Sequence, residues 1–342
     1  MSKKLVSFCV PSYNSAEYLF HALDSLIPGG DEIEVLIIDD GSKDKTLDIA
    51  KEYEKKYPNI FKAVHEENKG HGGAINNALS LASGEYFKVL DSDDWVKENG
   101  LKELLKTIRE AKEKPDLILM PYTYIHGDEH KEGKTIRYGQ FIKPNTIVSW
   151  NQMKRFDAAR NLTLHSVVYK TDLLRDEVKL DLPEHCFYED NYMIYAPLPY
   201  VKKILYIDEP LYQYLLGRAG QSMQTKNLIN RNENLMRVSC LAFKTIDLVS
   251  LKKENHGLYK MMKHQLIMMT ASPLLYTSFK KPKELAKKEK KAFIDNLKET
   301  NLKQYKMLHK HPYIWWPSIN NWIGKAASAF MLWVIRMFGS IN

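Results

Sequence analysis

The first third of this 342-residue chain alternates short apolar runs with segments of helical periodicity, and no other feature constrains the fold as strongly. Apolar runs between turn-forming residues are typical of buried strands, whereas apolar residues spaced by three and four indicate helices. Strands are expected at 5–10, 34–38, 61–65, 86–90 and 116–124, with helices at 15–26, 44–57, 74–82 and 101–111. This order predicts an α/β fold with a mostly parallel, doubly wound sheet, which binds ligands at the carboxyl ends of its strands.

The pattern changes twice further along the chain. After residue 126 it loosens: alternation over 135–148 predicts a hairpin or an edge ribbon, 150–160 has helical spacing, and short strands are expected at 204–208 and 211–215. After Thr225 the composition becomes that of long helices, at 227–251, 257–276 and 283–299. We therefore expect an α/β domain before Thr225, a helical appendage over 226–310, and an apolar or amphipathic C-terminal helix within 311–342.

Acidic residues follow directly on two of the predicted strands. Asp39-Asp40-Gly41-Ser42 comes after EVLII, and Asp91-Ser92-Asp93-Asp94 comes after YFKVL. Because the carboxyl ends of parallel strands meet at one edge of a sheet, both clusters should reach one crevice. Carboxylates held close together repel one another and are costly to desolvate, so a cation is expected among them; oxygen ligands suit Mn²⁺ or Mg²⁺, which in turn suit a diphosphate. Asp39 and Asp44 can equally be turn or cap residues, and we assign Asp44 that role.

A glycine-rich segment, Asn68-Lys69-Gly70-His71-Gly72-Gly73, precedes a helical pattern. Glycines there let backbone amides approach a ligand, and the start of a helix favours negative charge. The segment matches neither the dinucleotide fingerprint nor the P-loop, so it is not diagnostic alone. His71 could contact a phosphate or an acceptor, and it could equally be a packed or exposed loop histidine.

Taken in order, five short segments resemble the inverting glycosyltransferases of family 2, which have the GT-A fold. They are Val10-Pro11-Ser12-Tyr13-Asn14, Asp39-Asp40-Gly41-Ser42-Lys43-Asp44, residues 68–76, Gly84-Glu85-Tyr86 leading to Leu90-Asp91-Ser92-Asp93-Asp94, and Tyr188-Glu189-Asp190-Asn191. The resemblance covers roughly residues 4–222. It implies a doubly wound mixed sheet flanked by helices, with a nucleotide-sugar-binding half over 1–125 and an acceptor-binding, catalytic half over 126–225.

The resemblance also implies roles for single residues on the donor side. Pro11 and Tyr13 would line the pocket for the nucleotide base, and Asp40 would accept a hydrogen bond from that base. Asp91 would face the ribose or base, and Asp93 would bind the metal that bridges the two phosphates. The other donor-binding residues would be Asn14, Asn68, Gly70, His71 and Ser92, with Arg218, Gln221 and Ser222 in a segment that closes over the phosphates. Asp94 is expected to support the turn.

On the acceptor side, Asp190 would be the catalytic base and Glu189 would position it or the acceptor, with His165 as the next candidate for the base. The implied reaction moves a sugar from a nucleotide diphosphate sugar, expected to be a UDP-sugar, to a hydroxyl of a glycan or lipid-linked acceptor with inversion. Such enzymes serve cell-surface polysaccharide or glycoconjugate synthesis. One position departs from the family: Ile75 stands where an arginine usually precedes the second asparagine, so phosphate contact there would fall to Lys69 or Arg218.

The C-terminal region is basic and aromatic. The net charge of +8 permits anionic partners, much of it lies in the last third, and we expect no nucleic-acid partner. The apolar run between Lys325 and Arg336 is ten residues, about half of the ~20 that a membrane span needs. Tryptophans beside lysine and arginine suit an interfacial helix on an anionic bilayer; the alternative is a helix packed on its own domain or on a homo-oligomer partner.

Two further features bear on location and on competing functions. Cys9, Cys186 and Cys240 fit no zinc or disulfide spacing, which indicates a reducing cytosol, with the inner face of the cell membrane as the expected place of action if the tail binds lipid. A sugar-nucleotide-forming nucleotidyltransferase would need a Gly-rich, Arg-containing loop where this chain has Pro-Ser-Tyr-Asn. An inactive scaffold is disfavoured by the intact carboxylates at 91, 93, 189 and 190.

Overall fold

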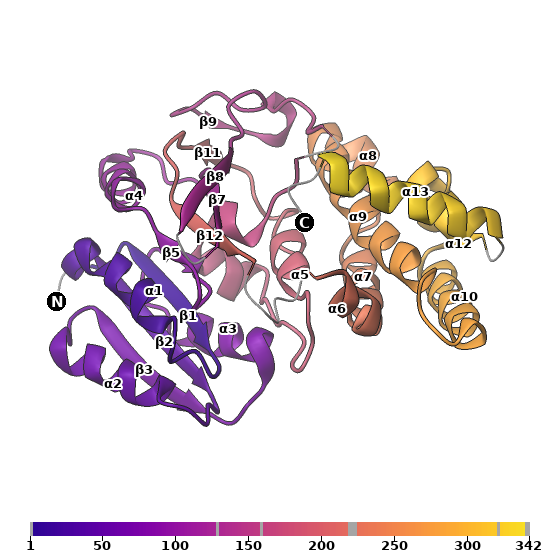
Figure 1. Cartoon of the computed structure of the whole chain (residues 1–342). Helices are drawn as coiled ribbons and strands as arrows, with labels where there is room; N and C mark the ends of the chain where they lie inside the picture. Colours follow the sequence, from indigo (N-terminus) through magenta and orange to yellow (C-terminus); the bar gives the residue numbers. More distant parts are fainter. Residues whose placement is uncertain (1–2, 128–129, 158–159, 218–223, 320–321, 339–342) are drawn as a thin grey trace. The chain divides into compact units, whose positions relative to one another are not determined.

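The computed structural model describes residues 3–127, 130–157, 160–217, 224–319 and 322–338, and for residues 323 and 334–338 it describes the backbone alone. The chain divides into two units (Figure 1). Unit 1 comprises Met1–Lys154, Thr163–Cys186 and Tyr200–Arg218, and unit 2 comprises Arg155–Leu162, Phe187–Pro199 and Ala219–Asn342. Two segments that precede Thr225 in the chain therefore group with the C-terminal helices.

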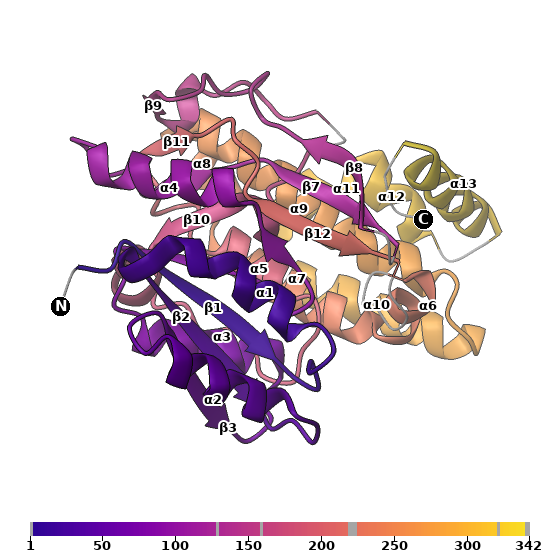
Figure 2. The ribbon, with the colours of Figure 1, turned by 60° about the vertical axis from the view of Figure 1, so that its left-hand side comes forward.

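Unit 1 is built on an eight-stranded mixed sheet, which confirms the predicted fold class. The strands, in spatial order, are β3 (Phe61–Glu66), β2 (Ile33–Asp40), β1 (Val6–Ser12), β4 (Tyr86–Val89), β10 (Val167–Lys170), β6 (Leu117–Leu119), β11 (Ile204–Tyr206) and β9 (Ile147–Val148). The first four run parallel, and β10 runs antiparallel to both of its neighbours. All residues of β1 are buried, as expected for a strand covered on both faces (Figure 2).

Four helices connect or flank these strands: α1 (Leu19–Leu26), α2 (Thr46–Lys56), α3 (Gly70–Leu81) and α4 (Glu98–Glu110). Crossovers between parallel strands are right-handed. Because β1, β2 and β3 follow one another in one direction across the sheet, α1 and α2 lie on one face. The chain then returns past β1 to β4, which places α3 on the other face. Apolar spacing fixes their orientation; α4 buries Leu101, Leu104, Leu105 and Ile108. The predicted helix at 15–26 begins only at Leu19, since the amide of Ser15 donates to Thr46 Oγ1 in a preceding turn.

A second, four-stranded sheet has the order β5 (Trp95–Val96), β12 (Tyr212–Leu216), β7 (Tyr122–His126) and β8 (Lys131–Ile136). It corrects three expectations. The single strand predicted at 116–124 is two strands in different sheets, because Pro121 has no N–H to donate and interrupts the ladder. A hairpin or an edge ribbon was predicted at 135–148; no hairpin forms, since β8 pairs with β7 and β9 with β11, but each of these strands lies at the edge of its sheet. Of the helix predicted at 150–160, the described residues form a 3-10 turn over Trp150–Gln152.

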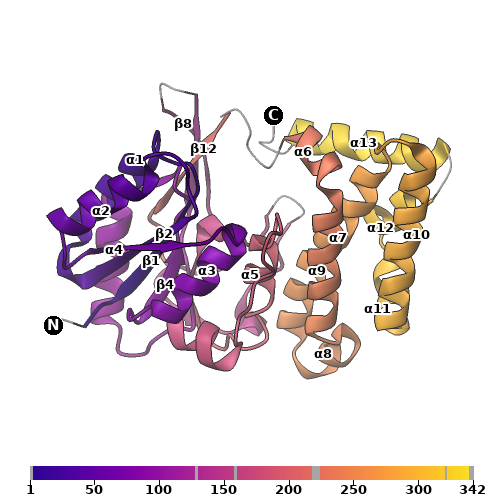
Figure 3. The same cartoon turned by 90° about the horizontal axis from the view of Figure 1, so that it is seen from below.

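Unit 2 is helical over the residues described. Its helices are α5 (Asp190–Tyr195), α6 (Thr225–Asn230), α7 (Asn232–Thr245), α8 (Leu248–Glu254), α9 (His256–Thr277), α10 (Lys283–Thr300), α11 (Leu302–His309), α12 (Pro312–Ser318) and α13 (Trp322–Phe338) (Figure 3). The stretch predicted as one helix at 227–251 is thus three, the last restarted by Asp247, which caps the amide of Val249. Buried polar side chains fix the helices: Gln304 accepts from Leu248 N at 2.7 Å and donates to Phe243 O at 3.0 Å. Within the described ranges, every helix is too short or too polar to cross a membrane.

The N-terminal turn of α4 packs against the chain at Pro210–Leu211, and Gly100 makes this approach feasible. A Cβ at Gly100 would clash with Pro210 O and lie 2.7 Å from Leu211 Cα, both backbone atoms that cannot rotate away. We expect Gly100→Ala to lower the free energy of unfolding by about 1–3 kcal/mol, the usual cost of overpacking, as measured by urea denaturation. Gly139→Ala is the matched control, because its Cβ would meet only Tyr206 Cε1 at 3.6 Å. Equal stability of the two variants would contradict this account.

Candidate active site

The loops that follow β1, β2 and β4 meet at one edge of the main sheet. Ser12 pairs with Asp39, and Cys9 with Val89, so the three strands end side by side. Hydrogen bonds then join the loops to one another. In the loop that follows β1, the backbone amide of Asn14 donates to Ser42 Oγ, in the loop that follows β2, at 2.9 Å. The hydroxyls of Ser15 and Ser92 lie 2.8 Å apart and join the first loop to the third. Both carboxylate clusters therefore lie at this edge, as the strand pattern predicted.

The side chains expected to hold the nucleotide base have different exposures. Pro11 is buried within β1, whereas Tyr13 is 50% exposed just beyond the strand. Asn14 has a positive φ of 49° and its Oδ1 accepts from the amide of Lys43 at 2.9 Å. Tyr13 thus presents a ring at the edge, while Asn14 holds two loops together.

Asp40 organises the glycine-rich loop. Its Oδ1 accepts from Lys69 N at 2.6 Å, and its Oδ2 accepts from Gly70 N and Asn68 Nδ2, both at 2.9 Å. Gly70 has a φ of +79°, and a Cβ there would lie 3.1 Å from His185 N, so glycine is needed. Burial raises the pKa of Asp40, although these amide hydrogen bonds act in the opposite direction. The role predicted for Asp40 toward the base stays a prediction beside this observed structural one.

Asp39, which the sequence left open as a turn residue, faces the opposite way and is fully buried. Its Oδ2 lies 2.6 Å from His65 Nδ1, and its Oδ1 is buried without a hydrogen-bond partner among the described residues. A buried carboxylate oxygen in a folded protein usually accepts a hydrogen bond, from the protein, from water or from a ligand. The only sequence signal for this was its place at the end of a strand.

The Asp91–Asp94 turn is anchored by Asp94. The amide of Asp94 donates to Asp91 O at 3.0 Å, and its buried carboxylate accepts from Tyr212 Oη at 2.6 Å and Leu215 N at 2.8 Å. These contacts fix the turn to β12, the supporting role expected for Asp94. Burial, with the charges of Asp93 and Asp91, raises the pKa of Asp94 well above its ordinary value. Asp93 is half-buried on the same turn.

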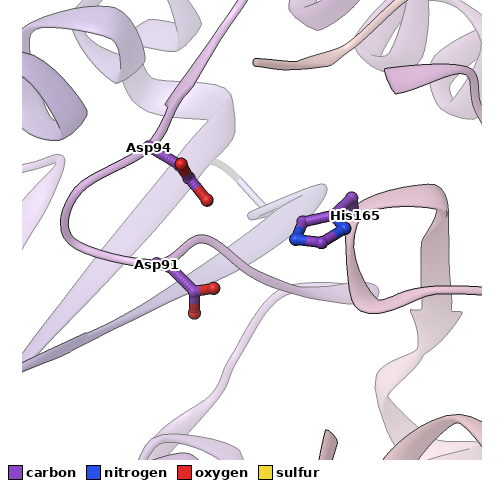
Figure 4. A group of neighbouring side chains, drawn as sticks. All are labelled: Asp91, Asp94 and His165. Carbon is purple, nitrogen blue, oxygen red and sulfur yellow. The ribbon is translucent and has the colours of Figure 1, made fainter. Parts of the chain in front are cut away.

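Asp91 lies between two histidines. His71 Nε2 is 3.0 Å from Asp91 Oδ1, and ligand atoms of Asp91, Asp94 and His165 lie within 4.8 Å of one another (Figure 4). Burial acts to raise the pKa of Asp91, but the hydrogen bond to His71 and the charges of His71, His165 and Lys88 outweigh it, so the pKa is lowered. Sequence motifs missed His165 at this place, because it lies more than 70 residues further along the chain.

Lys88 and three tyrosines fix His165. The buried ammonium of Lys88 donates to the carbonyls of Leu164, His165 and Val167 at 2.6, 3.0 and 3.2 Å. The imidazole stacks on the ring of Tyr214, with 4.1 Å between the ring centroids. It also contacts the rings of Tyr212 and Tyr122, at centroid distances of 4.7 and 5.2 Å. Burial lowers the pKa of His165 to about 4, so it is neutral at pH 7, and its Nδ1 has no hydrogen-bond partner among the described residues. Asp91 and this neutral imidazole, with Asp94 beside them, offer oxygen and nitrogen ligands of the kinds that bind a divalent cation.

The acidic pair assigned to the acceptor belongs to unit 2. Asp190 begins α5, and its Oδ1 accepts from Asn191 Nδ2 at 3.0 Å; Glu189 is buried. The preceding Tyr188 has a φ of +68°, and burial raises its pKa to about 12. Since the donor-side residues lie in unit 1, the joint action of the two sets stays a prediction. Arg218, Gln221 and Ser222 lie outside the described residues.

Known proteins resemble this chain in sequence. Residues 7–176 match the family model Glycosyl transferase family 2. EpsH of Bacillus subtilis is 31% identical over 231 residues, 63% of this chain and 61% of EpsH. MG025 of Mycoplasma genitalium, named an uncharacterized glycosyltransferase, is 31% identical over 66% of this chain and 72% of its own. GgaB of B. subtilis, named a minor teichoic acid biosynthesis protein, is 28% identical over 66% of this chain but 24% of its own. The chain thus spans less than two thirds of EpsH and about a quarter of GgaB.

Solved structures agree on the fold. S. aureus TarS 1–349, in complex with UDP-GlcNAc, matches 90% of each chain with a TM-score of 0.57 and 22% identity. The mannosyltransferase PcManGT from Pyrobaculum calidifontis, in complex with GDP-Man and Mn²⁺, matches 98% of this chain and 88% of the PcManGT chain. The TM-score is 0.53 and the sequence identity 16%. The fold is that of the GT-A glycosyltransferases. With the sequence matches, it follows that the chain belongs to glycosyltransferase family 2.

Lys88 offers a direct test of how this edge is built. Lys88→Met keeps the apolar stem but removes the donors to three buried carbonyls. We expect the free energy of unfolding to fall by about 1–3 kcal/mol for each carbonyl that finds no other donor, as measured by chemical denaturation. Lys102→Met is the matched control, because its ammonium pairs only with exposed Glu98 one helical turn away, a pair worth about 0.3–0.5 kcal/mol. Unchanged stability of Lys88→Met would show that this ammonium does not hold the segment.

Proposed function

We propose that this enzyme transfers a sugar from a nucleotide diphosphate sugar, with UDP as the nucleotide, to a hydroxyl of a glycan or lipid-linked acceptor, with inversion. Its place of action would be the cytoplasmic face of the cell membrane, in cell-surface polysaccharide synthesis. The observation that carries the proposal is the sheet edge where Asp39, Asp91 and His165 keep polar atoms available for a ligand. The relation to GgaB supports the polysaccharide assignment.

The donor base would sit against the β1 and β2 ends. A uracil ring carries an imide N–H, and the unpartnered, buried Oδ1 of Asp39 is an acceptor of the matching kind. The exposed ring of Tyr13, one residue past β1, could stack on the base. That TarS binds UDP-GlcNAc supports UDP as the nucleotide.

The diphosphate would be held beside the Asp91–Asp94 turn with a divalent cation. Asp91 and His165 have the geometry for ligands, Asp94 lies with them, and Asp93 is the ligand that the family resemblance implies. A bound Mn²⁺ or Mg²⁺ would supply Lewis-acid stabilisation of the leaving diphosphate, and the Mn²⁺ bound by PcManGT supports this chemistry. His71, hydrogen-bonded to Asp91, would orient that carboxylate toward the ligand.

Transfer then needs one base. The acceptor oxygen attacks the anomeric carbon as its proton passes to the Asp190 carboxylate. The bond from the anomeric carbon to the phosphate oxygen breaks, and its electron pair leaves with the nucleoside diphosphate. A single displacement inverts the configuration. Asn191 Nδ2, which donates to Asp190 Oδ1, would help to orient this carboxylate.

The first test separates the metal ligands. Full-length protein is incubated with a panel of nucleotide sugars in Mn²⁺ or EDTA while nucleoside diphosphate release is measured, and Mn²⁺ affinity is measured by EPR. Asp93→Asn and His165→Ala should each weaken Mn²⁺ binding by more than about 10-fold, and Asp93→Asn should abolish turnover. Asp48→Asn, an exposed carboxylate on α2, is the control. Wild-type Mn²⁺ affinity in both variants, or equal release in EDTA, would refute the metal assignment.

The second test concerns the base. Asp190→Asn keeps the shape of the side chain but cannot accept a proton, so kcat should fall by about 10²–10⁴-fold, the usual contribution of general base catalysis. Donor Kd should stay nearly unchanged, and Glu189→Gln should lose less. Steady-state transfer and equilibrium donor binding, measured on both variants, check this. An active Asp190→Asn with an inactive Glu189→Gln would exchange the two roles, and full activity of both would place the base elsewhere.

A further inference from the structure

The helix α13 of unit 2 turns three of its aromatic side chains outward. Trp322 is 78% exposed, Phe330 58% and Trp333 55%, while Ser328 and Met331 are buried. At 3.6 residues per turn, the three aromatics share one helical face and the two buried residues lie on the opposite one. A helix that packs on a domain normally buries its large apolar residues; α13 buries Ser328 and Met331 but exposes Trp322, Phe330 and Trp333.

The neighbouring helix also exposes aromatic side chains. On α12, which packs against α13, the residues Tyr313, Trp315 and Trp316 are 38%, 48% and 37% exposed. We call Trp322, Phe330 and Trp333, which share one face of α13, the aromatic surface. Large exposed apolar groups on one helical face mark an interaction site.

Specific contacts on the inner side fix this orientation. Ser328 Oγ donates to Ser278 Oγ at 3.1 Å, and a Cβ at Gly324 would clash with Ile319 O. The buried ammonium of Lys290, on α10, donates to Pro317 O at 2.7 Å. Because the inner faces of both helices are fixed by these contacts, the aromatic side chains cannot turn inward without breaking them.

The segment that holds α12 and α13 in place carries exposed positive charge. Ser278, which contacts α13, is followed within ten residues by exposed lysines at 281, 283, 287 and 288, and Lys325 lies on the exposed face of α13 itself. Lys287 pairs with Glu284, whereas no ion pair is found for the other four among the residues described. A second copy of the chain docking here through the same surface would bring these lysines together, so charge complementarity favours an anionic occupant.

We propose that the aromatic surface docks on an anionic lipid bilayer, with α13 lying in the plane of the interface. Tryptophans prefer the headgroup level and flanking lysines bind anionic lipid. Over the residues that the structure describes, neither α12 nor α13 is long and apolar enough to span the bilayer. This docking would bring the enzyme to a lipid-linked acceptor, and in that respect it rests on the proposed function.

Vesicle binding of the full chain tests the proposal. We expect co-sedimentation with phosphatidylcholine vesicles that contain about a third phosphatidylglycerol, and a blue shift of tryptophan emission. The triple variant W322Q/F330Q/W333Q should lose at least tenfold in partitioning. K281E/K283E/K288E should lose the preference for anionic vesicles, at about fivefold per lysine. The control F20Q/L302Q removes two comparably exposed apolar side chains, at 45% and 48%, from other surfaces and should bind as the wild type.

Three results would overturn it: no binding of the wild type to vesicles, unchanged binding of W322Q/F330Q/W333Q, or a wild-type dimer in light scattering that this variant converts to monomer. Circular dichroism confirms folding of each variant, and K325E provides a milder change on the same face. Asp190→Asn should bind vesicles as the wild type does. Vesicle binding without catalysis would therefore contradict the proposed function alone, and catalysis without vesicle binding would contradict the docking alone.

Discussion

Lys88 carries a buried ammonium in the middle of unit 1, and the donor-side edge depends on how that charge is satisfied. Burial lowers the pKa of Lys88 to about 7, although the Asp91 and Asp94 charges act to raise it. Its Nζ donates hydrogen bonds to three backbone carbonyls within residues 164–167 and lies 4.9 Å from the ring centroid of Tyr212. A buried charge is costly unless its hydrogen bonds are complete. The chain at 164–167 is therefore held in one place, and His165 with it.

The carboxylates at this edge divide into two kinds. The carboxylates of Asp40 and Asp94 accept hydrogen bonds from the protein itself. Asp40 accepts from backbone amides of the glycine-rich loop, and Asp94 accepts from Tyr212 Oη and Leu215 N. Asp39 and Asp91 keep capacity for a ligand, since Asp39 Oδ1 has no partner among the described residues and Asp91 is only half-buried. Because Asp40 and Asp94 make the loops rigid, Asp39 and Asp91 are in position before a ligand binds. Such preorganisation is the condition for strong electrostatic stabilisation of a bound ligand.

In unit 2, buried polar contacts fix the positions of helices whose outer face is aromatic. Within it, Asn232 Nδ2 donates to Thr277 Oγ1 at 2.6 Å and Gln304 joins α7, α8 and α11, so polar contacts fix the helices in register. Its last helices then present aromatic side chains to the outside. On the proposed function, the enzyme would join a water-soluble donor to a lipid-linked acceptor, and the outward aromatic face of α13 would suit such a boundary between water and lipid.

The sequence by itself determined the parallel part of the sheet, because buried strands read as continuous apolar runs and their positions follow from local pattern. It also determined that Asp39–Asp40 and Asp91–Asp94 meet, since parallel strands end at one edge. It could not show that 116–124 divides between two sheets or that β9 lies apart from β8, because β6, β7 and β9 each pair with a strand far away in the chain. The place of His165 beside Asp91 and the unpartnered Oδ1 of Asp39 were likewise decided only by tertiary structure. Burial and hydrogen bonding depend on the neighbours that packing supplies, and local sequence does not specify those neighbours.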